Sequence, residues 1–199
     1  KVYFDSLLYQ GPMEQAPKSL AGIVQTVKQT LKLLQIPYKD LLIRIRSSIP
    51  PGKGLGSSAS VAIAIVKSLF KYSNEQYTKE ILLQLANISE TFAHGAPSGI
   101  DPLTITSDSP IWYRKNEPIE YIYPKGSFHF VIADSGQMAD TKTAVENVTR
   151  RMKETPQKIY AKMERIGEIT YQARKALEKS SKQLLGYLLN EAQKELEAI

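Results

Sequence analysis

Two short stretches of the sequence contain residues that could do chemistry, and the first is rich in glycine. Residues 50–59 read Pro-Pro-Gly-Lys-Gly-Leu-Gly-Ser-Ser-Ala, with three glycines at alternate positions. Glycine lets the backbone approach an anion closely and adopt positive φ angles. A helix beginning at Ser57 or Ser58 would direct its free N–H groups and the positive end of its dipole at the same point. The stretch therefore predicts a polyphosphate site, in which the two serine hydroxyls could donate hydrogen bonds or contact a metal.

The glycine spacing differs from that of two familiar phosphate loops. A P-loop requires Gly, four further residues and then Gly-Lys-Ser/Thr, whereas Lys53 lies between the first two glycines. The dinucleotide-binding fingerprint would require a glycine where the chain has Ser57. On glycine spacing alone, a plain turn before a helix is the more common explanation.

The second stretch, residues 90–101, reads Glu-Thr-Phe-Ala-His-Gly-Ala-Pro-Ser-Gly-Ile-Asp. Glu90 closes a predicted helix one turn before His94, and Asp101 follows the turn that Pro97-Ser98-Gly99 forces. A carboxylate just after a tight turn is well placed to meet a substrate hydroxyl. A helical carboxylate nearby could hold Mg²⁺, which prefers oxygen ligands. Residue types alone also allow Glu90 to be a solvated helix residue and Asp101 to be a helix N-cap.

Hydrophobic spacing predicts the elements that position these residues. Alternation predicts a strand over 1–9, broken at Gln10-Gly11-Pro12, and a second strand from Leu41 to Ser47. Helical spacing predicts a helix from Lys18 to Ile36. The run that follows Ser57 is apolar almost all round, which is typical of a helix in an interior.

The rest of the chain becomes increasingly helical. Thr78 is a good N-cap for a helix ending near Ala93. We expect a loop at 95–99, and a long helical region begins at Thr141. The order of elements argues for an α+β fold with a boundary near residue 140. Between these helices, three segments read as strands: 111–114, 119–123 and 128–134.

Composition excludes several classes of protein. The 199 residues include no Cys and two His, so disulfide scaffolds, Cys nucleophiles and His-rich metal sites are excluded. Apolar residues make up 42% and charged residues 23%, as in globular domains. No apolar run approaches the roughly 20 residues that span a bilayer, and the first residues do not form a signal peptide. A cytoplasmic setting is therefore expected.

The formal net charge of +6 is compatible with an anionic ligand or with nucleic acid. The basic residues are spread along the chain, and the densest groups lie in amphipathic helical segments. We interpret them as solvated helix faces and expect no nucleic-acid binding.

The complete string at 50–59 resembles the second signature motif of the GHMP kinase superfamily. His-Gly-Ala-Pro-Ser-Gly-Ile-Asp at 94–101 resembles the mevalonate kinase branch of that superfamily. Two further strings fit the same branch: Leu8-Tyr9-Gln10-Gly11-Pro12, and Ala133-Asp134-Ser135-Gly136 through Asp140-Thr141-Lys142. The resemblance covers nearly the whole chain. It implies a two-lobed GHMP kinase-like fold, with a ribosomal protein S5 domain 2-like N-terminal lobe at 1–139 and the start of a helix-rich C-terminal lobe at 140–199.

The resemblance implies ATP-dependent phosphorylation of the primary hydroxyl of mevalonate, with Mg²⁺ accompanying ATP. By position in the motifs, Asp101 is the catalytic base, and Ser58 and Glu90 are the metal ligands. His94, Ser98 and Thr141 lie at the substrate, and we favour a role for His94 in shaping the turn over one in proton transfer. Lys142 is a candidate partner of the mevalonate carboxylate. The phosphates of ATP would be bound by Gly52, Lys53, Gly54, Leu55, Gly56, Ser57 and Ser58.

The chain also departs from the family pattern. Family members begin with a segment containing a Pro-Gly-Lys motif, whose lysine is thought to favour the ionised catalytic aspartate, and they carry a later Gly-rich motif that closes over the phosphates. Neither occurs in this sequence, so we expect an incomplete fold with weak ATP binding and low turnover. Another GHMP kinase, such as a phosphomevalonate or sugar kinase, and a non-catalytic fragment of the same fold stay open. A homodimer also stays open.

Overall fold

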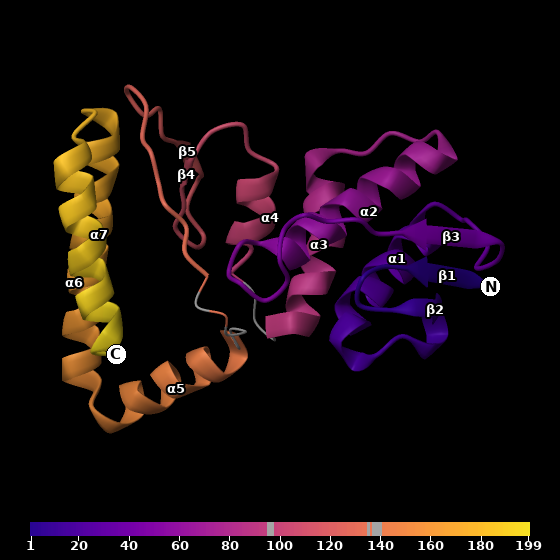
Figure 1. The fold of residues 1–199 in the computed structure, drawn as a ribbon, viewed down its shortest axis with the longest axis horizontal. Coiled ribbons are helices and arrows are strands. Elements are labelled where there is room, and N and C mark those ends of the chain that lie inside the picture. The colour runs from indigo at the N-terminus through magenta and orange to yellow at the C-terminus, as the bar shows by residue number, and fades with distance from the viewer. Residues whose placement is uncertain (95–97, 135, 137–140) are drawn as a thin grey trace. The chain divides into compact units, whose positions relative to one another are not determined.

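The structure is a computed structural model that describes residues 1–94, 98–134, 136 and 141–199. The chain forms two compact units (Figure 1). The first consists mainly of Lys1–Ser107, and the second mainly of residues 108–134 and 141–199. Each unit has its own cluster of buried apolar side chains, so each is described separately.

A three-stranded sheet opens the first unit. Strands β1 (Val2–Asp5), β2 (Gln10–Pro12) and β3 (Leu41–Arg44) lie in the order β2-β1-β3. β1 pairs antiparallel with β2 and parallel with β3. The predicted strand over 1–9 is therefore shorter, and the predicted break at 10–12 is itself a strand. The cause is a tight turn in which the Ser6 N–H donates to the carbonyl of Tyr9 at 3.0 Å.

Helices make up most of the remainder of the first unit. The predicted helix over 18–36 is found as a short 3₁₀ turn followed by α1, and the predicted helix from Thr78 is found as α3. Thr78 caps α3 as expected, because its Oγ1 accepts the N–H of Ile81 at 3.3 Å. A further short helix, α4, follows α3 in the chain, in a segment for which the sequence predicted no helix. The helical segments are η1 (Met13–Gln15), η2 (Lys18–Leu20), α1 (Ala21–Leu33), α2 (Ser57–Ser73), α3 (Lys79–His94) and α4 (Ile100–Ile105).

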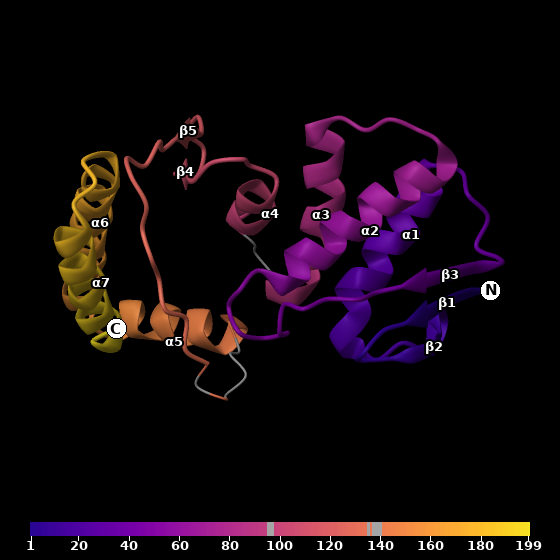
Figure 2. The same cartoon turned by 45° about the horizontal axis from the view of Figure 1, so that its top comes forward.

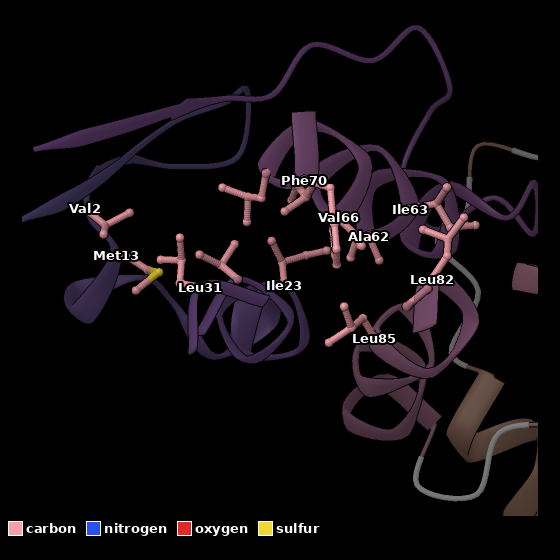
Figure 3. Close-up of a cluster of buried hydrophobic side chains, with 14 of the residues drawn as sticks. Val2, Met13, Ile23, Leu31, Ala62, Ile63, Val66, Phe70, Leu82 and Leu85 are labelled. Atoms are coloured by element: carbon pink, nitrogen blue, oxygen red, sulfur yellow. The ribbon is translucent and has the colours of Figure 1, made fainter. Parts of the chain in front are cut away.

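Helices α1, α2 and α3 contact one another, and α1 and α2 lie nearer to the sheet than α3 does (Figure 2). The shared core includes Val2 from β1, Leu31 from α1, Val66 from α2 and Leu85 from α3 (Figure 3). The opposite face of the sheet is exposed. This core holds the N-terminus of α2 and the C-terminal half of α3 in fixed relation.

One face of α2 is only partly covered by this core. The sequence predicts a helix that is apolar almost all round and hence fully interior, but Ala64 is exposed and Val61 is only half-buried. Both residues line an open groove of about 690 Å³ between α2 and β3. The interior prediction is thus correct for most of α2 and wrong for this face.

The second unit combines a small β-ribbon with three helices. The expected strand over 128–134 is wrong, since these described residues form no strand and Phe130, Val131 and Ile132 are 63%, 97% and 76% exposed. A strand requires a hydrogen-bonded partner, and hydrophobic alternation does not supply one. The elements are β4 (Ile111–Trp112), β5 (Glu120–Tyr121), α5 (Thr141–Glu154), α6 (Pro156–Glu178) and α7 (Lys182–Glu197).

The compact units divide at Ser107, and the predicted lobe boundary near residue 140 stays a prediction. Contacts with α6 join the β4–β5 ribbon to the second unit. Arg174 forms an ion pair with Glu120 at 2.8 Å and stacks over the Trp112 ring at 5.2 Å. The Lys125 N–H also donates to the carbonyl of Leu177 at 3.0 Å. Within the part of the chain that the structure describes, every helix is too short or too polar to span a lipid bilayer.

Candidate active site

The Gly-rich loop has the backbone geometry that its sequence predicts. Gly52, Gly54 and Gly56 have φ angles of +69°, +69° and +66°. A residue with a side chain is strained in this left-handed region, so the path of the loop favours glycine at all three positions. A Cβ atom at Gly54 would meet nothing within 4 Å. The preference for glycine at Gly54 is therefore one of conformation and not of space.

Helix α2 begins directly behind this loop. Gly56 is its N-cap and provides no side-chain hydrogen bond, and the first intrahelical bond runs from the Ser60 N–H to the Gly56 carbonyl at 3.0 Å. The amides of the first turn, from Ser57 onward, therefore have no intrahelical acceptor. Together with the positive end of the helix dipole, they form a site suited to phosphate groups.

Helix α3 carries the first of the two predicted carboxylates. Glu90 is 3% exposed, so the alternative of a solvated helix residue is wrong. The residue before it, Ser89, is 2% exposed. Both belong to the turn of α3 that packs against α1 and α2 within the core of the first unit.

A contact between two serines joins α2 to α3 at this point. The Ser58 Oγ lies 3.3 Å from the Ser89 Oγ. Because Glu90 follows Ser89, this contact brings the two predicted metal-binding residues, Ser58 and Glu90, into one neighbourhood. Both would offer oxygen, the atom that Mg²⁺ prefers.

The donor set fits Mg²⁺ bound with a nucleotide better than a permanent metal centre. Among the described residues, no group of three or more His, Cys, Asp or Glu side chains is arranged to hold a metal ion. Mg²⁺ in phosphate-transferring enzymes is commonly held by one or two protein groups, with substrate phosphates and water completing its coordination. A hydroxyl and a buried carboxylate would be sufficient for that role.

The second predicted carboxylate, Asp101, lies in the first turn of α4 and is exposed. The turn before it is as expected, because Gly99 is the N-cap with φ of +80°. The Ser98 Oγ accepts the Ile100 N–H at 3.3 Å, which gives Ser98 a local role at the start of α4. The sequence did not predict α4 itself.

Helix α4 contacts both α2 and α3. A Cβ atom at Gly56 would lie 3.5 Å from Cδ1 of Ile105, at the C-terminal end of α4. At the other end, a Cβ atom at Gly99 would lie 3.9 Å from Oδ1 of Asn87 in α3. The short helix thus runs from α3 to the Gly-rich loop, and Asp101 belongs to the same group of elements as the proposed phosphate site.

A cavity of about 290 Å³ opens beside the serine contact. It is lined by Ser58 of α2, by Ser89 and Phe92 of α3, by residues 18–19 of η2 and by residues 21–23 at the start of α1. Sequence reasoning missed the contributions of Ser89 and of α1. A hydroxyl at position 89, in register with the buried Leu82, Leu85 and Ala86, was the available signal.

Two predicted substrate residues cannot be placed by their side chains. His94 ends α3 and Thr141 begins α5, but both side chains lie outside the described part of the chain. Thr141 also belongs to the second compact unit. Their predicted roles therefore stay predictions.

The sequence of the chain is similar to those of known kinases. Residues 21–107 match the profile of the GHMP kinases N terminal domain. Mevalonate kinase of Pyrococcus furiosus is 27% identical over 191 residues, which cover 94% of this chain and 57% of the relative. Mevalonate kinase of Pyrococcus abyssi is 33% identical over 135 residues, covering 68% of this chain and 40% of the relative. The chain thus spans about half the length of the curated relatives it matches.

The fold is also that of a solved structure. The L. major mevalonate kinase in complex with R-mevalonate superposes with a TM-score of 0.77 and 23% sequence identity, covering 99% of this chain and 62% of that one. The α+β architecture predicted from the sequence is therefore confirmed.

Proposed function

We propose that the protein transfers the γ-phosphoryl group of ATP to the primary hydroxyl of mevalonate, giving 5-phosphomevalonate, because residues 21–107 match the profile of the GHMP kinases N terminal domain. The observation that carries this proposal is the grouping of α2, α3 and α4, which places the amides behind Gly56, the Ser58 hydroxyl, Glu90 and Asp101 on contacting elements. The choice of mevalonate is supported by the relatives that carry that name. The setting we propose is the cytoplasm.

The Gly-rich loop and the first turn of α2 would bind the phosphates of ATP. Phosphoryl transfer depends mainly on positioning and on neutralising charge, both of which backbone amides at a helix N-terminus provide. Lys53 within the loop would add positive charge. Ser58 and Glu90 would hold Mg²⁺. When bound, the ion would neutralise charge on the β- and γ-phosphates.

Asp101 would act on the acceptor. The primary hydroxyl oxygen of mevalonate attacks the γ-phosphorus, the bond from that phosphorus to the β–γ bridging oxygen breaks, and ADP leaves. The proton of the hydroxyl passes to the Asp101 carboxylate, which can accept it because the side chain is exposed at the start of α4. His94, Ser98 and Thr141 are proposed to line the acceptor site, with Ser98 acting through the backbone of α4.

The proposal is tested by measuring ADP release with a panel of acceptors: mevalonate, phosphomevalonate, homoserine and galactose. We expect mevalonate to be preferred. Preference for another acceptor would reassign the substrate within the GHMP kinases. An absence of nucleotide binding in calorimetry would instead favour a non-catalytic member of the fold.

Replacing Asp101 separates chemistry from binding. The Asp101→Ala variant should lower kcat by about 10²–10⁴-fold, the usual contribution of a general base, and should leave ADP affinity nearly unchanged. Asp108→Asn is the matched control, since Asp108 is also exposed but follows α4. An Asp101→Ala variant with the kcat of the parent chain would remove this residue from the mechanism.

A further inference from the structure

The hydroxyl of Ser89 makes an unusual contact for a buried serine in a helix. Buried or partly buried hydroxyls of this unit commonly bond to a carbonyl one turn earlier in the same helix, as Thr26 does to Gly22 at 3.1 Å and Thr30 does to Thr26 at 2.7 Å. The Ser89 Oγ instead lies 3.3 Å from the Ser58 Oγ, which belongs to a different helix. The side chain is therefore directed toward the N-terminus of α2.

Helix α1 packs closely against Ser89 at Gly22. A Cβ atom at Gly22 would lie 2.8 Å from the Ser89 carbonyl oxygen and 3.0 Å from its Oγ. Such distances are too short for any side chain, so the backbone of α1 can approach α3 this closely only because residue 22 is glycine. The position of this turn of α3 is thus fixed from one side by Gly22.

The Ser58 side of this contact is half-buried, in the first turn of α2. Ser58, Ser89 and Gly22 all line the cavity of about 290 Å³ at this end of the helix. A hydroxyl that gives a lone pair to a cation must direct its proton away from that cation. In the observed contact either oxygen can be the donor, so the Ser89 Oγ is placed to accept the Ser58 proton.

We propose that Ser89 is a positioning residue for the binding of a divalent cation with a nucleotide. It orients the Ser58 hydroxyl and, packed against Gly22, fixes the position of the helical turn that carries Glu90. The inference rests on the proposed function, since it assumes that Ser58 and Glu90 meet that cation. It adds two residues to the site that no motif of the sequence indicates.

The test uses Mn²⁺ as a spectroscopic probe, measuring its binding in the presence of ADP by electron paramagnetic resonance. We expect Ser89→Ala to weaken Mn²⁺ binding about fivefold, the loss expected for one hydrogen bond of ordinary strength. Ser89→Cys keeps a weak acceptor and should fall between Ser89→Ala and the parent chain. Ser73→Ala is the matched control, because the Ser73 hydroxyl bonds to the Phe70 carbonyl at the far end of α2, and it should leave Mn²⁺ binding unchanged.

A purely structural role for Ser89 predicts a different result. Ser89→Ala would then lower the unfolding midpoint and leave Mn²⁺ affinity equal to that of Ser73→Ala, which would overturn the inference. Ser58→Ala distinguishes a failure of the role of Ser89 from a failure of the metal-site assignment. If Ser58→Ala weakens Mn²⁺ binding and Ser89→Ala does not, the inference alone fails. If neither does, or if the parent chain binds no Mn²⁺ with ADP, the assignment of the metal site fails and the inference fails with it.

Discussion

The carboxylate of Asp5 links two strands of the sheet through two arginines. Its Oδ2 accepts hydrogen bonds from Nε of Arg44 at 2.8 Å and from a terminal nitrogen of Arg46 at 2.9 Å. The hydrogen bond from Arg46, followed by that from Arg44, holds the pKa of Asp5 below its ordinary value. Since β1 and β3 pair in parallel, these bonds reinforce the pairing of these two strands.

This lowered pKa predicts an acid-dependent loss of stability. A carboxyl whose pKa is lower in the folded state stabilises the fold above the unfolded pKa of about 3.9 and loses that contribution as the pH falls through the folded pKa. Asp5→Asn should therefore be less stable than the parent chain at neutral pH, by a small amount because both arginines are largely exposed. Below about pH 4 the difference should shrink.

Urea unfolding at neutral and acid pH, followed by far-ultraviolet circular dichroism, measures both values. Asp108→Asn is the control, because Asp108 is exposed and lies outside the sheet. A difference between Asp5→Asn and the parent chain that is the same at both pH values would contradict the argument.

Single residues show clearly where sequence reasoning reaches its limit. Ser58, Glu90 and Asp101 could be predicted as site residues because each belongs to a contiguous motif. Ser89 and Gly22 could not, because the roles we propose for them depend on contacts with residues that are distant in sequence. The Ser58–Ser89 contact spans 31 positions, and no local pattern encodes it.

At the scale of the elements, two helices of the second unit contain an interior glycine that the structure does not require. Gly167 in α6 and Gly186 in α7 are exposed, and a Cβ atom at either would meet nothing within 4 Å. Glycine in a helix interior is less favourable than alanine by about 0.5–1 kcal/mol. Gly167→Ala and Gly186→Ala should therefore each stabilise the second unit by about that amount.

The single tryptophan of the chain, Trp112, reports on this unit. It lies in β4 with its ring 6.3 Å from that of Tyr171 in α6, so its fluorescence should follow unfolding of the ribbon from the helices. Gly126→Ala is a control of opposite sign, since Gly126 has φ of +76° and an added Cβ would lie 2.7 Å from Oγ of Ser180. Equal effects of Gly126→Ala and Gly167→Ala on the fluorescence midpoint would refute the prediction.

Prediction of the elements succeeded where local spacing decides the structure. α1, α2 and α3 follow from helical periodicity and from capping residues such as Thr78. The predictions were wrong where strand pairing decides the structure. At 128–134, alternating apolar residues lack a partner strand, and at 10–12, residues that read as a break form a strand against β1. Helix α4 was missed because its six residues are too few for periodicity to be read.

At the scale of the whole molecule, the sheet of the first unit ends in an open edge. Within the described residues β3 pairs only with β1. The N–H groups of Leu41 and Ile45 point toward the β1 side, where they donate to the carbonyls of Lys1 and Asp5, so the Leu42 N–H points outward. This edge borders the groove of about 690 Å³ along α2. Unpaired edges of this kind are templates for adding another strand.

This open edge allows a second copy of the chain to supply the added strand. In an antiparallel pair centred on Ile43, Leu42 of one copy lies opposite Arg44 of the other. We expect the 199-residue chain, produced alone, to self-associate through this edge, a form of the homodimer that the sequence left open.

Leu42→Lys tests this pairing, because the new lysine would face Arg44 of the second copy and like charges directly opposite are destabilising. Leu7→Lys introduces the same charge at a side chain that is 90% exposed and outside the strands. In sedimentation velocity over a wide concentration range, the parent chain and Leu7→Lys should associate, while Leu42→Lys should shift toward the monomer. A monomeric parent chain, or equal association of Leu42→Lys and Leu7→Lys, would show that β3 does not mediate self-association, because a charge at the edge would then have had no interface to disturb.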